Sequence, residues 1–586
     1  MVYEFKGFRI DRTQRRLTQQ GRPVQLKPKI FDLLLYLVER QGQLVTKDEL
    51  MREIWSNTIV EENNITVSMS MLRKMLGDDR GGRKFIETVS GRGYRFVAEV
   101  TEISDERPAV STAVMSPGNA NNRYNLPEAP INSLAVFPVH KGGDGVEYLS
   151  EGITESIINK LSQIPKLRVL ACSTVLRFKG AEVDPQEMGK MLDVGAVMVV
   201  RVIQLGETLI IRSELVKVAD GSQIWGEQYE RTSSDLLGIQ DEIAKAIVEG
   251  LKLKLTLEQQ KRFTKRYTDN TEAYNLYLRG RYFWARYSKT WLLKGIESFK
   301  QAIEIDPSYA LAYCGLADAY FRLSNLYFPP REVMPKAKQA ALKAVEIDDD
   351  LAEAHSSLGL VRVYYDLDWN GARVELRRSL ELNPDLASAH QRYGSCLCFL
   401  GHFEESISHY HHALTLDPFS LQLSTNLATN YYLMGQNETA INYLEKTLEL
   451  EPSYIPTHFV LGCTYIQQGD LPKAIKEFQY VYELDEESYI ALGFMGYTHA
   501  LAGQRAEAEN LLSILTDIAS RKYVSPYCLA VIQLGLGRRD EAIDFLERLY
   551  QERNDWLVWL KVSPELRVLH DDPRFEDLLN RLGFLD

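Results

Sequence analysis

The chain has 586 residues, of which 45% are hydrophobic and 25% are charged, and these fractions exclude a disordered or fibrous protein. Its length predicts about three or four domains instead of a single core. The formal net charge of −12 is uneven, because residues 1–100 hold 18 Lys and Arg against 13 Asp and Glu, which predicts that the basic N-terminal part alone meets a polyanion.

Membrane insertion and disulfide chemistry are not expected. The longest nearly apolar run, residues 194–200, is far shorter than the roughly 20 residues of a membrane helix, and the N-terminus lacks the apolar core of a signal peptide. The cysteines form no Cys-x-x-Cys pair and have no histidines at metal-binding spacing, so we expect reduced, buried thiols in a cytoplasmic protein. They are Cys172, Cys314, Cys396, Cys398, Cys463 and Cys528.

The first hundred residues predict short strands followed by helices. Apolar and polar residues alternate in four short runs before residue 27, and a helix begins near Pro28, a residue favoured in the first helical turn. After Gly42, Thr46 is placed to cap a second helix, and Glu49, three residues later, completes a capping box.

A third helix, predicted over residues 63–76, separates two faces. At about 100° per residue, its larger apolar side chains form one stripe, and the opposite face is small, polar and basic. Asn, Ser and Lys side chains can reach base edges or phosphates in the major groove, and Val67 or Met71 can touch a thymine methyl group. A plain solvated face is the alternative. The candidate contacts are Asn63, Asn64, Thr66, Val67, Ser70, Met71, Arg73 and Lys74, and the apolar stripe consists of Ile65, Met69, Leu72 and Leu76.

Residues 85–97 predict a β-hairpin whose tip contains two glycines that can take positive φ. The tip carries Ser90 and Arg92, and Arg95 lies just beyond it. Solvation accounts for one exposed arginine. Two helices, a third helix with a polar, basic face and a two-stranded wing together predict a winged helix-turn-helix, whose wing reaches the minor groove or the DNA backbone.

The segments "VTKDELMREIW", "NITVSMSMLRKML" and "IETVSGRGYRF" follow one another in the order found in the OmpR/PhoB type of winged-helix effector domain, and residues 1–100 resemble that family along their whole length. The resemblance implies a sequence-specific transcriptional regulator that binds promoter DNA. It places the recognition helix at residues 63–74, Arg92 at the wing, and a surface for RNA polymerase in the loop Ser56–Glu62.

The chain departs from such relatives in three ways. Ser68, Ser70 and Met71 stand where many relatives carry His or Arg, which implies fewer phosphate contacts and self-association of two copies on one site. Residues 101–130 contain four prolines and no periodicity, so they predict a flexible linker, whereas membrane-bound relatives of the CadC and ToxR kind have a spanning helix there. Because no phosphoacceptor receiver segment is recognised ahead of the DNA-binding segment, we expect no control through phosphorylation of an aspartate.

Residues 131–256 predict a small α/β domain with a mixed sheet. Strands alternate with helices at first, and three strands with a hairpin at residues 206–207 and a final helix follow. The segments "LAVFPV", "SEGITESIINKLSQIPKLRVL", "LDVGAVMVVRV" and "GSQIWGEQYER" resemble a domain distantly related to the amino-terminal domain of TolB. That domain recurs beside tetratricopeptide repeat (TPR) arrays and in some adenylate cyclase chains, and the resemblance implies a sensory or assembly role.

Acidic residues surround the glycine-rich stretch "KGGDG" at the start of this segment. A solvated surface is favoured over a metal or phosphate site, because no Walker lysine, no G-x-G-x-x-G and no pair of nucleophile and base accompanies them. The sequence therefore predicts neither an enzyme nor a cofactor. The acidic residues are Asp144, Glu147, Glu151 and Glu155.

The C-terminal half has a 34-residue period. A helix–turn–helix unit of that length, with Gly at the end of its first helix and a small residue where the helices cross, is the TPR. The pattern predicts about eight units over residues 271–552, with residues 553–586 as a cap. The periodic glycines are Gly401, Gly435, Gly469, Gly503 and Gly537, and the small residues five positions later are Ser406, Ala440, Ala474, Ala508 and Ala542.

Stacked units of this kind form a concave groove that binds a protein or peptide. The run "HYHHAL" holds three histidines, and they could bind a metal only if His409 paired with His412 or with His402. Because Cys and carboxylate partners at metal-binding spacing are missing, surface histidines are favoured, and no metal is predicted. The third histidine is His411.

The sequence thus predicts a multidomain fold: an α+β winged helix-turn-helix, a small α/β domain and an all-α TPR superhelix. The function that follows is regulation of transcription, with double-stranded promoter DNA bound by the head and a signal or partner received by the body. The alternative is a TPR scaffold whose head is not a sequence-specific DNA binder, in keeping with the modest positive charge of residues 1–100. Salt-dependent, sequence-preferring duplex binding separates the two.

Overall fold

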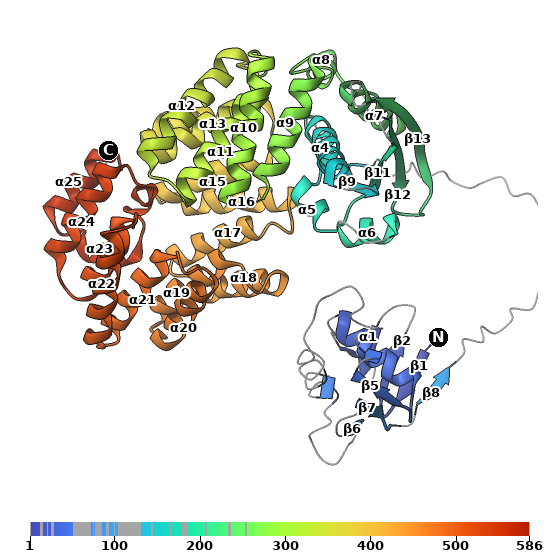
Figure 1. Cartoon of the computed structure of the whole chain (residues 1–586), viewed down its shortest axis with the longest axis horizontal. Helices are drawn as coiled ribbons and strands as arrows, with labels where there is room; N and C mark the ends of the chain where they lie inside the picture. The colour runs from blue at the N-terminus through green and yellow to red at the C-terminus, as the bar shows by residue number, and fades with distance from the viewer. Residues whose placement is uncertain are drawn as a thin grey trace, which may run out of the picture. The chain divides into compact units, whose positions relative to one another are not determined.

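In the computed structural model, the chain forms two compact units, residues 1–125 and residues 126–586, and each is described by itself (Figure 1). The first unit contains the predicted head, and the second joins the predicted α/β segment and the helical repeats in one body. The structure describes residues 2–11, 16–19, 22–24, 28–47, 49–50, 69, 72–73, 76, 85–89, 93–98, 100–103, 131–141, 144–164, 166–178, 184–205, 208–232, 236–251, 253, 255–286 and 288–584.

Two antiparallel sheets build the first unit, with strand orders β4-β3-β2-β1-β8 and β5-β7-β6. The four predicted leading strands are present. A fifth strand, β8, pairs with β1 so that Val2 lies opposite Ile103, which corrects the expectation that the linker begins at residue 101. The elements are β1 (Val2–Phe5), β2 (Phe8–Asp11), β3 (Arg16–Gln19), β4 (Arg22–Val24), α1 (Pro28–Glu39), β5 (Leu44–Thr46), β6 (Ile86–Val89), β7 (Gly93–Phe96) and β8 (Thr101–Ile103).

Four phenylalanines join the two sheets of the first unit. Phe5 stacks on Phe8 with ring centroids 5.6 Å apart and meets the edge of Phe96 at 5.2 Å, and Phe85 completes the cluster. All four side chains are buried. Because aromatic burial dominates small cores, this cluster fixes the hairpin β6–β7 against the N-terminal sheet.

The second unit begins with the predicted small α/β domain, and its mixed sheet has the order β10-β9-β11-β12-β13. Strand β9 is parallel to β10 and β11, and the remaining neighbours are antiparallel. The predicted hairpin is confirmed by the pairing of Leu205 with Thr208, whereas the short helices α5 and α8 were not predicted. The elements are β9 (Ser133–Lys141), α4 (Asp144–Leu161), β10 (Arg168–Val169), α5 (Cys172–Leu176), α6 (Pro185–Met191), β11 (Ala196–Leu205), β12 (Thr208–Lys217), β13 (Gln223–Thr232), α7 (Leu236–Gly250) and α8 (Leu257–Phe263).

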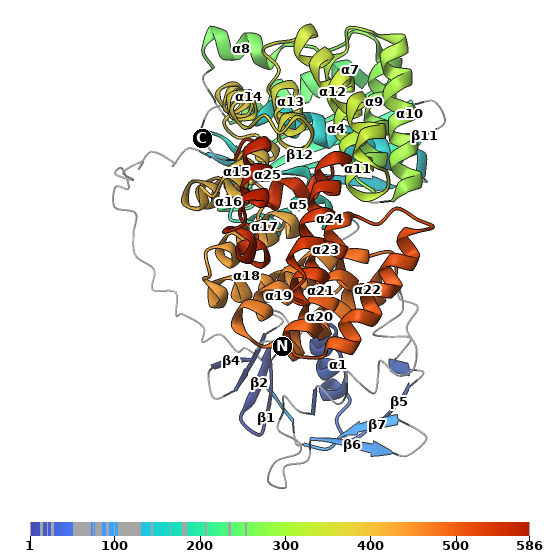
Figure 2. The ribbon, with the colours of Figure 1, turned by 90° about the vertical axis from the view of Figure 1, so that its left-hand side faces the viewer.

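Sixteen helices, α9 to α24, follow as eight antiparallel pairs that stack into the predicted all-α array (Figure 2). They are α9 (Thr271–Trp284), α10 (Lys289–Ile305), α11 (Ala310–Leu326), α12 (Pro330–Ile347), α13 (Ala352–Val361), α14 (Trp369–Leu382), α15 (Ala387–Leu400), α16 (Phe403–Leu416), α17 (Leu421–Leu433), α18 (Asn437–Leu450), α19 (Ile455–Gln468), α20 (Leu471–Leu484), α21 (Tyr489–Leu501), α22 (Arg505–Ala519), α23 (Pro526–Gly535) and α24 (Arg539–Glu552). A π-helical turn, η2 (Arg362–Asp366), follows α13, and the C-terminal segment contains η3 (Asp555–Trp559), η4 (Pro564–Leu569) and α25 (Pro573–Arg581).

The periodic glycines end the first helix of their repeats, as predicted. All five have a left-handed backbone, with φ between 75° and 85°, which glycine adopts without steric cost. The small residues five positions later are fully buried where the two helices of a repeat cross. Ser406 is the polar member of that series, and its hydroxyl donates to the Gly394 carbonyl at 2.7 Å.

The α/β domain contacts the repeat array at two separate places. Helix α4 packs against α9, and α5 lies beside the turn between α16 and α17 (Figure 1). At that turn, the Asp417 carboxylate accepts hydrogen bonds of 2.5 Å from Ser173 and Thr174, and the Ala171 amide donates to the Leu416 carbonyl. The domain therefore bridges the first repeat and the junction of the fourth and fifth repeats.

The C-terminal segment caps the array and also returns to earlier repeats. Trp369, at the start of α14, stacks on Phe584 at 4.7 Å, and its indole nitrogen donates to the Leu582 carbonyl at 2.7 Å. Trp559 meets Phe399 of α15 at 4.6 Å. The C-terminus accordingly lies next to α14 (Figure 2), and residues 554–584 occupy part of the surface formed by the first helices of the repeats.

Candidate nucleic-acid interface

The third helix of the first unit buries its predicted apolar stripe. Met69, Leu72 and Leu76 are helical and at most 4% exposed, and they pack in the core beneath the hairpin. Ile65, the fourth predicted member, lies outside the described residues. Burial of this stripe directs the opposite, polar face of the helix away from the core.

Arg73 connects this helix to the wing. Its Nη2 donates to the Ile86 carbonyl at 3.0 Å, and its guanidinium lies 5.9 Å from the centre of the Tyr94 ring. The sequence predicts Arg73 as a DNA contact but points to neither of these partners, which lie on β6 and β7. The helix and the wing are thereby held in one fixed arrangement.

Arg95 lies on the wing strand β7, in register with Glu87 of β6. The guanidinium Nη1 is 3.6 Å from the Glu87 carboxylate, and both side chains are more than a third exposed. Its Nε is buried without a hydrogen-bond partner among the described residues. Because exposed ion pairs contribute little to stability, the Arg95 guanidinium can exchange this carboxylate for a phosphate.

The second helix is capped as predicted, since the Glu49 amide donates to the Thr46 hydroxyl at 3.2 Å. The Glu49 carboxylate accepts from the Tyr36 hydroxyl at 2.9 Å, and the Arg40 guanidinium lies 3.6 Å from the Tyr36 ring centre. This link between the first two helices was not predicted. This link holds together the first two helices, on which the third helix packs.

The remaining predicted DNA contacts, and the predicted surface for RNA polymerase, lie outside the described residues. They are Asn63, Asn64, Thr66, Val67, Ser70, Met71, Lys74, Ser90 and Arg92, and the loop Ser56–Glu62.

Gly93 allows the wing to pair with β5, and the sequence did not single it out for this role. A Cβ atom at this position would lie 2.1 Å from the Val45 carbonyl oxygen and 2.9 Å from the Thr46 Cα. Real Cβ atoms do not approach other atoms this closely. Only glycine fits between the two strands.

We expect Gly93→Ala to destabilise the first unit by about 1–3 kcal/mol, because the added methyl group forces β5 and β7 apart. Hydrogen exchange of the Val45 and Thr46 amides in the full chain measures the effect. Gly42→Ala is the control, because Gly42 also has positive φ but no atom near its Cβ position. Equal acceleration of exchange in both variants would contradict the steric explanation.

In the second unit, two of the four acidic residues of α4 form ion pairs with α9 and the turn that follows it, where a solvated face was expected. Glu155 accepts from Arg281 of α9, and Glu147 lies 3.3 Å from Arg286. Throughout the described part of the chain, no group of His, Cys, Asp and Glu is arranged to hold a metal ion, and no described helix is long and apolar enough to cross a membrane.

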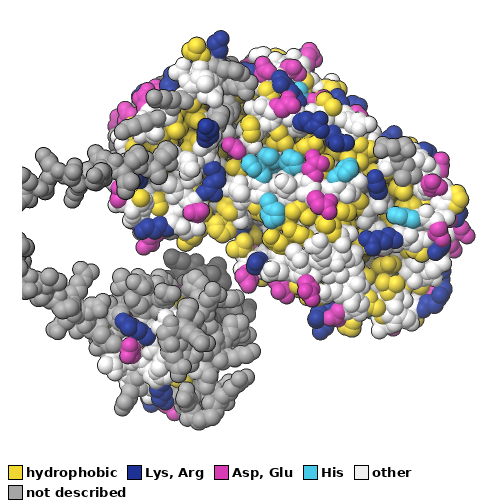
Figure 3. Space-filling view, turned by 180° about the vertical axis from the view of Figure 1, so that it is seen from behind, with side chains coloured by type: hydrophobic (Ala, Val, Ile, Leu, Met, Phe, Trp, Pro, Cys, Tyr) yellow, Lys and Arg dark blue, Asp and Glu magenta, His cyan; other side chains and the backbone are white. Residues whose placement is uncertain are grey.

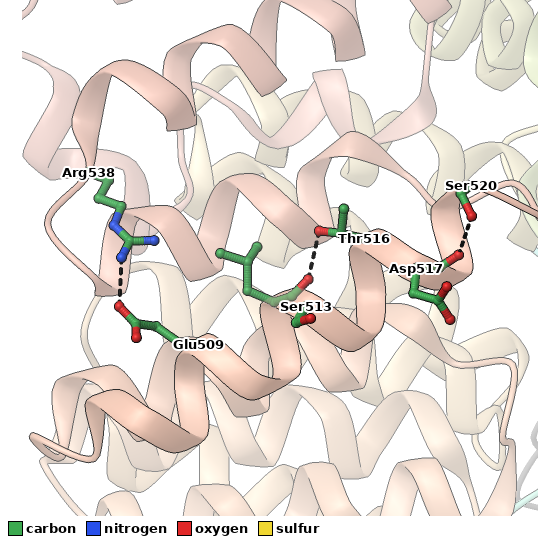
Figure 4. A pocket seen from close by; sticks show the side chains of 7 residues that line it. Glu509, Ser513, Thr516, Asp517, Ser520 and Arg538 are labelled. Atoms are coloured by element: carbon green, nitrogen blue, oxygen red, sulfur yellow. Dashed lines mark hydrogen bonds and ion pairs between the residues drawn. The ribbon is translucent and has the colours of Figure 1, made fainter.

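An open depression of about 680 Å³ runs along α22, and most of its polar side chains bond within the protein (Figure 4). Arg538 donates to Glu509 at 2.6 Å, Thr516 to the Leu512 carbonyl, and Ser520 to the Asp517 carbonyl. A depression whose polar groups already have partners offers few directional contacts to a ligand.

Family models match three parts of the chain. Residues 21–96 match the family described as "Transcriptional regulatory protein, C terminal". Residues 421–454 and 455–488 match "Tetratricopeptide repeat", and residues 294–324 match "TPR repeat". The two 34-residue matches coincide with the helix pairs α17–α18 and α19–α20.

Relatives extend beyond these segments. The chain is 27% identical over 431 residues to "Transcriptional regulator HilA" of Salmonella typhimurium, which covers 72% of this chain and 71% of the relative. It is 28% identical over 241 residues to "Putative adenylate cyclase 3" of Rhizobium meliloti, with 40% of each protein covered. The solved DNA-binding domain of Escherichia coli CadC aligns with 17% of this chain and 94% of that structure, at 31% identity and a TM-score of 0.16.

Residues 21–96 therefore form an OmpR/PhoB-type winged helix of the transcriptional regulatory protein C-terminal family, and this chain, in which tetratricopeptide repeats follow that domain, is similar to bacterial transcriptional regulators.

Proposed function

We propose that the protein is a non-enzymatic transcriptional regulator that binds promoter DNA through its first unit. The observation that carries this proposal is the bond from Arg73 to the Ile86 carbonyl, together with the buried stripe of the third helix. A recognition helix fixed to its wing presents two groove-reading elements as one rigid surface, which lowers the entropic cost of binding DNA. Such a protein acts where the chromosome lies, in the cytoplasm.

The second unit receives the signal in this proposal. TPR arrays bind proteins, but residues 554–584 already cover part of the inner surface here. A partner protein therefore binds the uncovered part of the array or displaces this segment. Two copies on one site and a contact of residues 56–62 with RNA polymerase complete the proposed mechanism.

Selection of duplexes from a random pool by the full-length protein, at two salt concentrations, tests the function. Enrichment of one sequence motif, with affinity that falls as salt rises, is the expected result. Binding without sequence preference, or no binding at either salt concentration, would favour the scaffold alternative.

We expect Arg92→Ala to weaken binding to the selected duplex by about 1–3 kcal/mol, because a wing arginine in a groove loses its charge-assisted contacts. Electrophoretic mobility shift or fluorescence anisotropy measures the affinity. Arg9→Ala serves as the control, since Arg9 lies on β2 of the N-terminal sheet and is half-exposed beside Glu4. Equal affinity of Arg92→Ala and the unmodified protein would remove Arg92 from the interface.

A further inference from the structure

A basic and aromatic surface lies on the first repeat of the second unit, where α9 turns into α10 (Figure 1). Residues 273–296 contain five Lys and Arg and no Asp or Glu, whereas Asp and Glu outnumber Lys and Arg, 80 to 68, in the whole chain. The charge of this segment is therefore opposite to that of the protein to which it belongs. Six of its side chains, which we call the α9–α10 patch, are Arg279, Tyr282, Phe283, Arg286, Trp291 and Lys294.

Two stacked rings form the centre of the patch. Phe283 of α9 and Trp291 of α10 have ring centroids 5.2 Å apart. The Arg279 guanidinium lies 5.5 Å from the centre of the Phe283 ring. The Lys294 ammonium lies 4.4 Å from the centre of the Trp291 ring and 6.0 Å from that of Phe283. The rings thus hold cations from two helices next to each other, because a cation is attracted to the face of an aromatic ring.

The charges of Arg279 and Lys294 are not compensated within the protein. Both side chains are exposed, and neither forms an ion pair with a described residue. Arg286 differs, because its guanidinium lies 3.4 Å from the Tyr282 ring centre and 3.3 Å from the Glu147 carboxylate. Cations that are exposed, unpaired and held in position can bind phosphate at a low cost in side-chain entropy.

Two polyanions fit cations that alternate with aromatic rings: the phosphate backbone of a nucleic acid and an anionic membrane. A membrane takes up aromatic side chains, but here Phe283 and Trp291 stack on each other beside the cations. Among the described residues of this segment, Leu293 is the one large hydrophobic side chain that is strongly exposed, at 45%. One such side chain buries little surface in lipid, so the geometry favours a nucleic acid.

We propose that the α9–α10 patch binds the phosphate backbone of double-stranded DNA through Arg279 and Lys294, without reading the base sequence. Because the ring faces are occupied by each other and by cations, the patch has no platform for unstacked bases, which favours a duplex over a single strand. The inference deepens the proposed function and rests on it for the identity of the polyanion. Two phosphate contacts from the second unit raise the affinity for every duplex alike.

Fluorescence anisotropy of the full-length protein, with one duplex that contains the selected motif and one that lacks it, tests the site over a series of salt concentrations. Arg279→Ala/Lys294→Ala should weaken binding to both duplexes by the same factor and reduce the slope of log affinity against log salt by about 2. Lys446→Ala/Lys476→Ala is the matched control, because it removes the same charge from exposed positions on α18 and α20 and should keep the slope. Equal slopes for the two double variants would overturn the proposal.

A charge-preserving variant, Arg279→Lys/Lys294→Arg, separates the effect of charge from that of structure. It should bind both duplexes as the unmodified protein does, and a loss as large as that of the alanine variant would contradict the proposed phosphate contacts. Sedimentation with vesicles of equal parts phosphatidylcholine and phosphatidylglycerol tests the membrane. Loss of vesicle binding in the alanine variant, with an unchanged slope on DNA, would assign the patch to lipid instead.

Failure of the proposed function has a different signature from failure of this inference. If the first unit does not read sequence, the unmodified protein binds the two duplexes equally, but the alanine variant still has the smaller salt slope. If the patch does not touch DNA, the preference for the selected motif remains and the slopes of the alanine variant and its control agree.

Discussion

Trp369→Ala is expected to lower the free energy of unfolding of the second unit by about 3–5 kcal/mol. Trp369 is 5% exposed, stacks on Phe584 and donates its indole hydrogen to the Leu582 carbonyl. Truncation removes a large aromatic contact and leaves a buried carbonyl without its donor. Denaturant unfolding of the full chain, followed by far-ultraviolet circular dichroism, measures the loss.

Two further variants serve as controls for the effect of Trp369→Ala. Val374→Ala, on the same helix but 61% exposed, should change the stability by less than about 0.5 kcal/mol. Trp369→Phe should fall between the two, because it keeps an aromatic ring against Phe584 but cannot donate to Leu582. If Trp369→Ala were no more destabilising than Val374→Ala, the return of the C-terminus to the third repeat would not contribute to stability.

The second large effect, on the pH dependence of stability, is expected at a histidine that occupies the same position in the third, fourth and sixth repeats. In the third repeat, His355 lies 2.6 Å from the carboxylate of Glu375, and in the sixth repeat His458 lies 2.6 Å from that of Glu477. The other ring nitrogen of each faces a backbone carbonyl at 2.8 Å. Two such acceptors require the imidazolium form, so burial, which lowers the pKa of both histidines, is outweighed by the hydrogen bonds to glutamate.

The fourth repeat breaks this pattern. His390 bonds to the Pro384 carbonyl in the same way, but His409 stands where the other repeats have glutamate, with the two Nδ1 atoms 2.9 Å apart. Burial lowers the pKa of His390 to about 4, and the neighbouring His412 and His409 oppose its charge as well. Figure 3 shows histidines gathered with acidic and basic side chains on one face of the second unit.

The sign of the pH dependence follows. A histidine with a lowered pKa stays neutral in the folded protein at a pH at which the unfolded chain takes up a proton. The free energy of unfolding therefore decreases as the pH is lowered below about 6.5. The free energy of unfolding decreases by about 3 kcal/mol in total, and this decrease is complete near pH 4, the pKa of His390 in the folded protein. His409→Glu gives His390 the partner found in the third and sixth repeats, and it should abolish this loss and add stability that is present at acid pH and lost as the pH rises.

Unfolding free energies of the unmodified protein and of His409→Glu, measured from neutral to acid pH, test the expectation. His411→Glu is the matched control, since His411 is exposed on the same helix. Other charges near the pair, Glu405 beside His409 and Asp385 beside His412, are the same in all three proteins. Parallel pH profiles for the two variants would show that the His390–His409 pair is not the sensitive group.

Local features of this fold were predictable, and distant contacts were not. The 34-residue spacing of the glycines placed the helix ends, because a left-handed residue at a helix end is a local requirement. The stripe of Met69, Leu72 and Leu76 was predictable for the same reason. In contrast, Trp369 and Leu582 are separated by 213 residues, and no periodicity in the sequence points from one to the other.

The candidate sites show the same limit. The sequence identified the polar face of the third helix but not the carbonyl that Arg73 meets, because that partner lies on a strand whose register is set by the hairpin. It noted the histidines of the fourth repeat but treated them alone, since the significance of His409 appears only when the same position is compared across repeats.

An array of repeats ordinarily unfolds piecemeal, because each unit touches only its neighbours. Here the α/β domain spans the first repeat and the turn at Asp417, and the C-terminal segment spans the third and last repeats. These two long-range contacts join repeats that are not neighbours in the stack. Unfolding of one repeat therefore removes contacts of units far along the chain. We therefore expect the second unit to unfold in a single cooperative transition. We also expect it to fold slowly for a helical protein, because both contacts join segments that are far apart in the sequence.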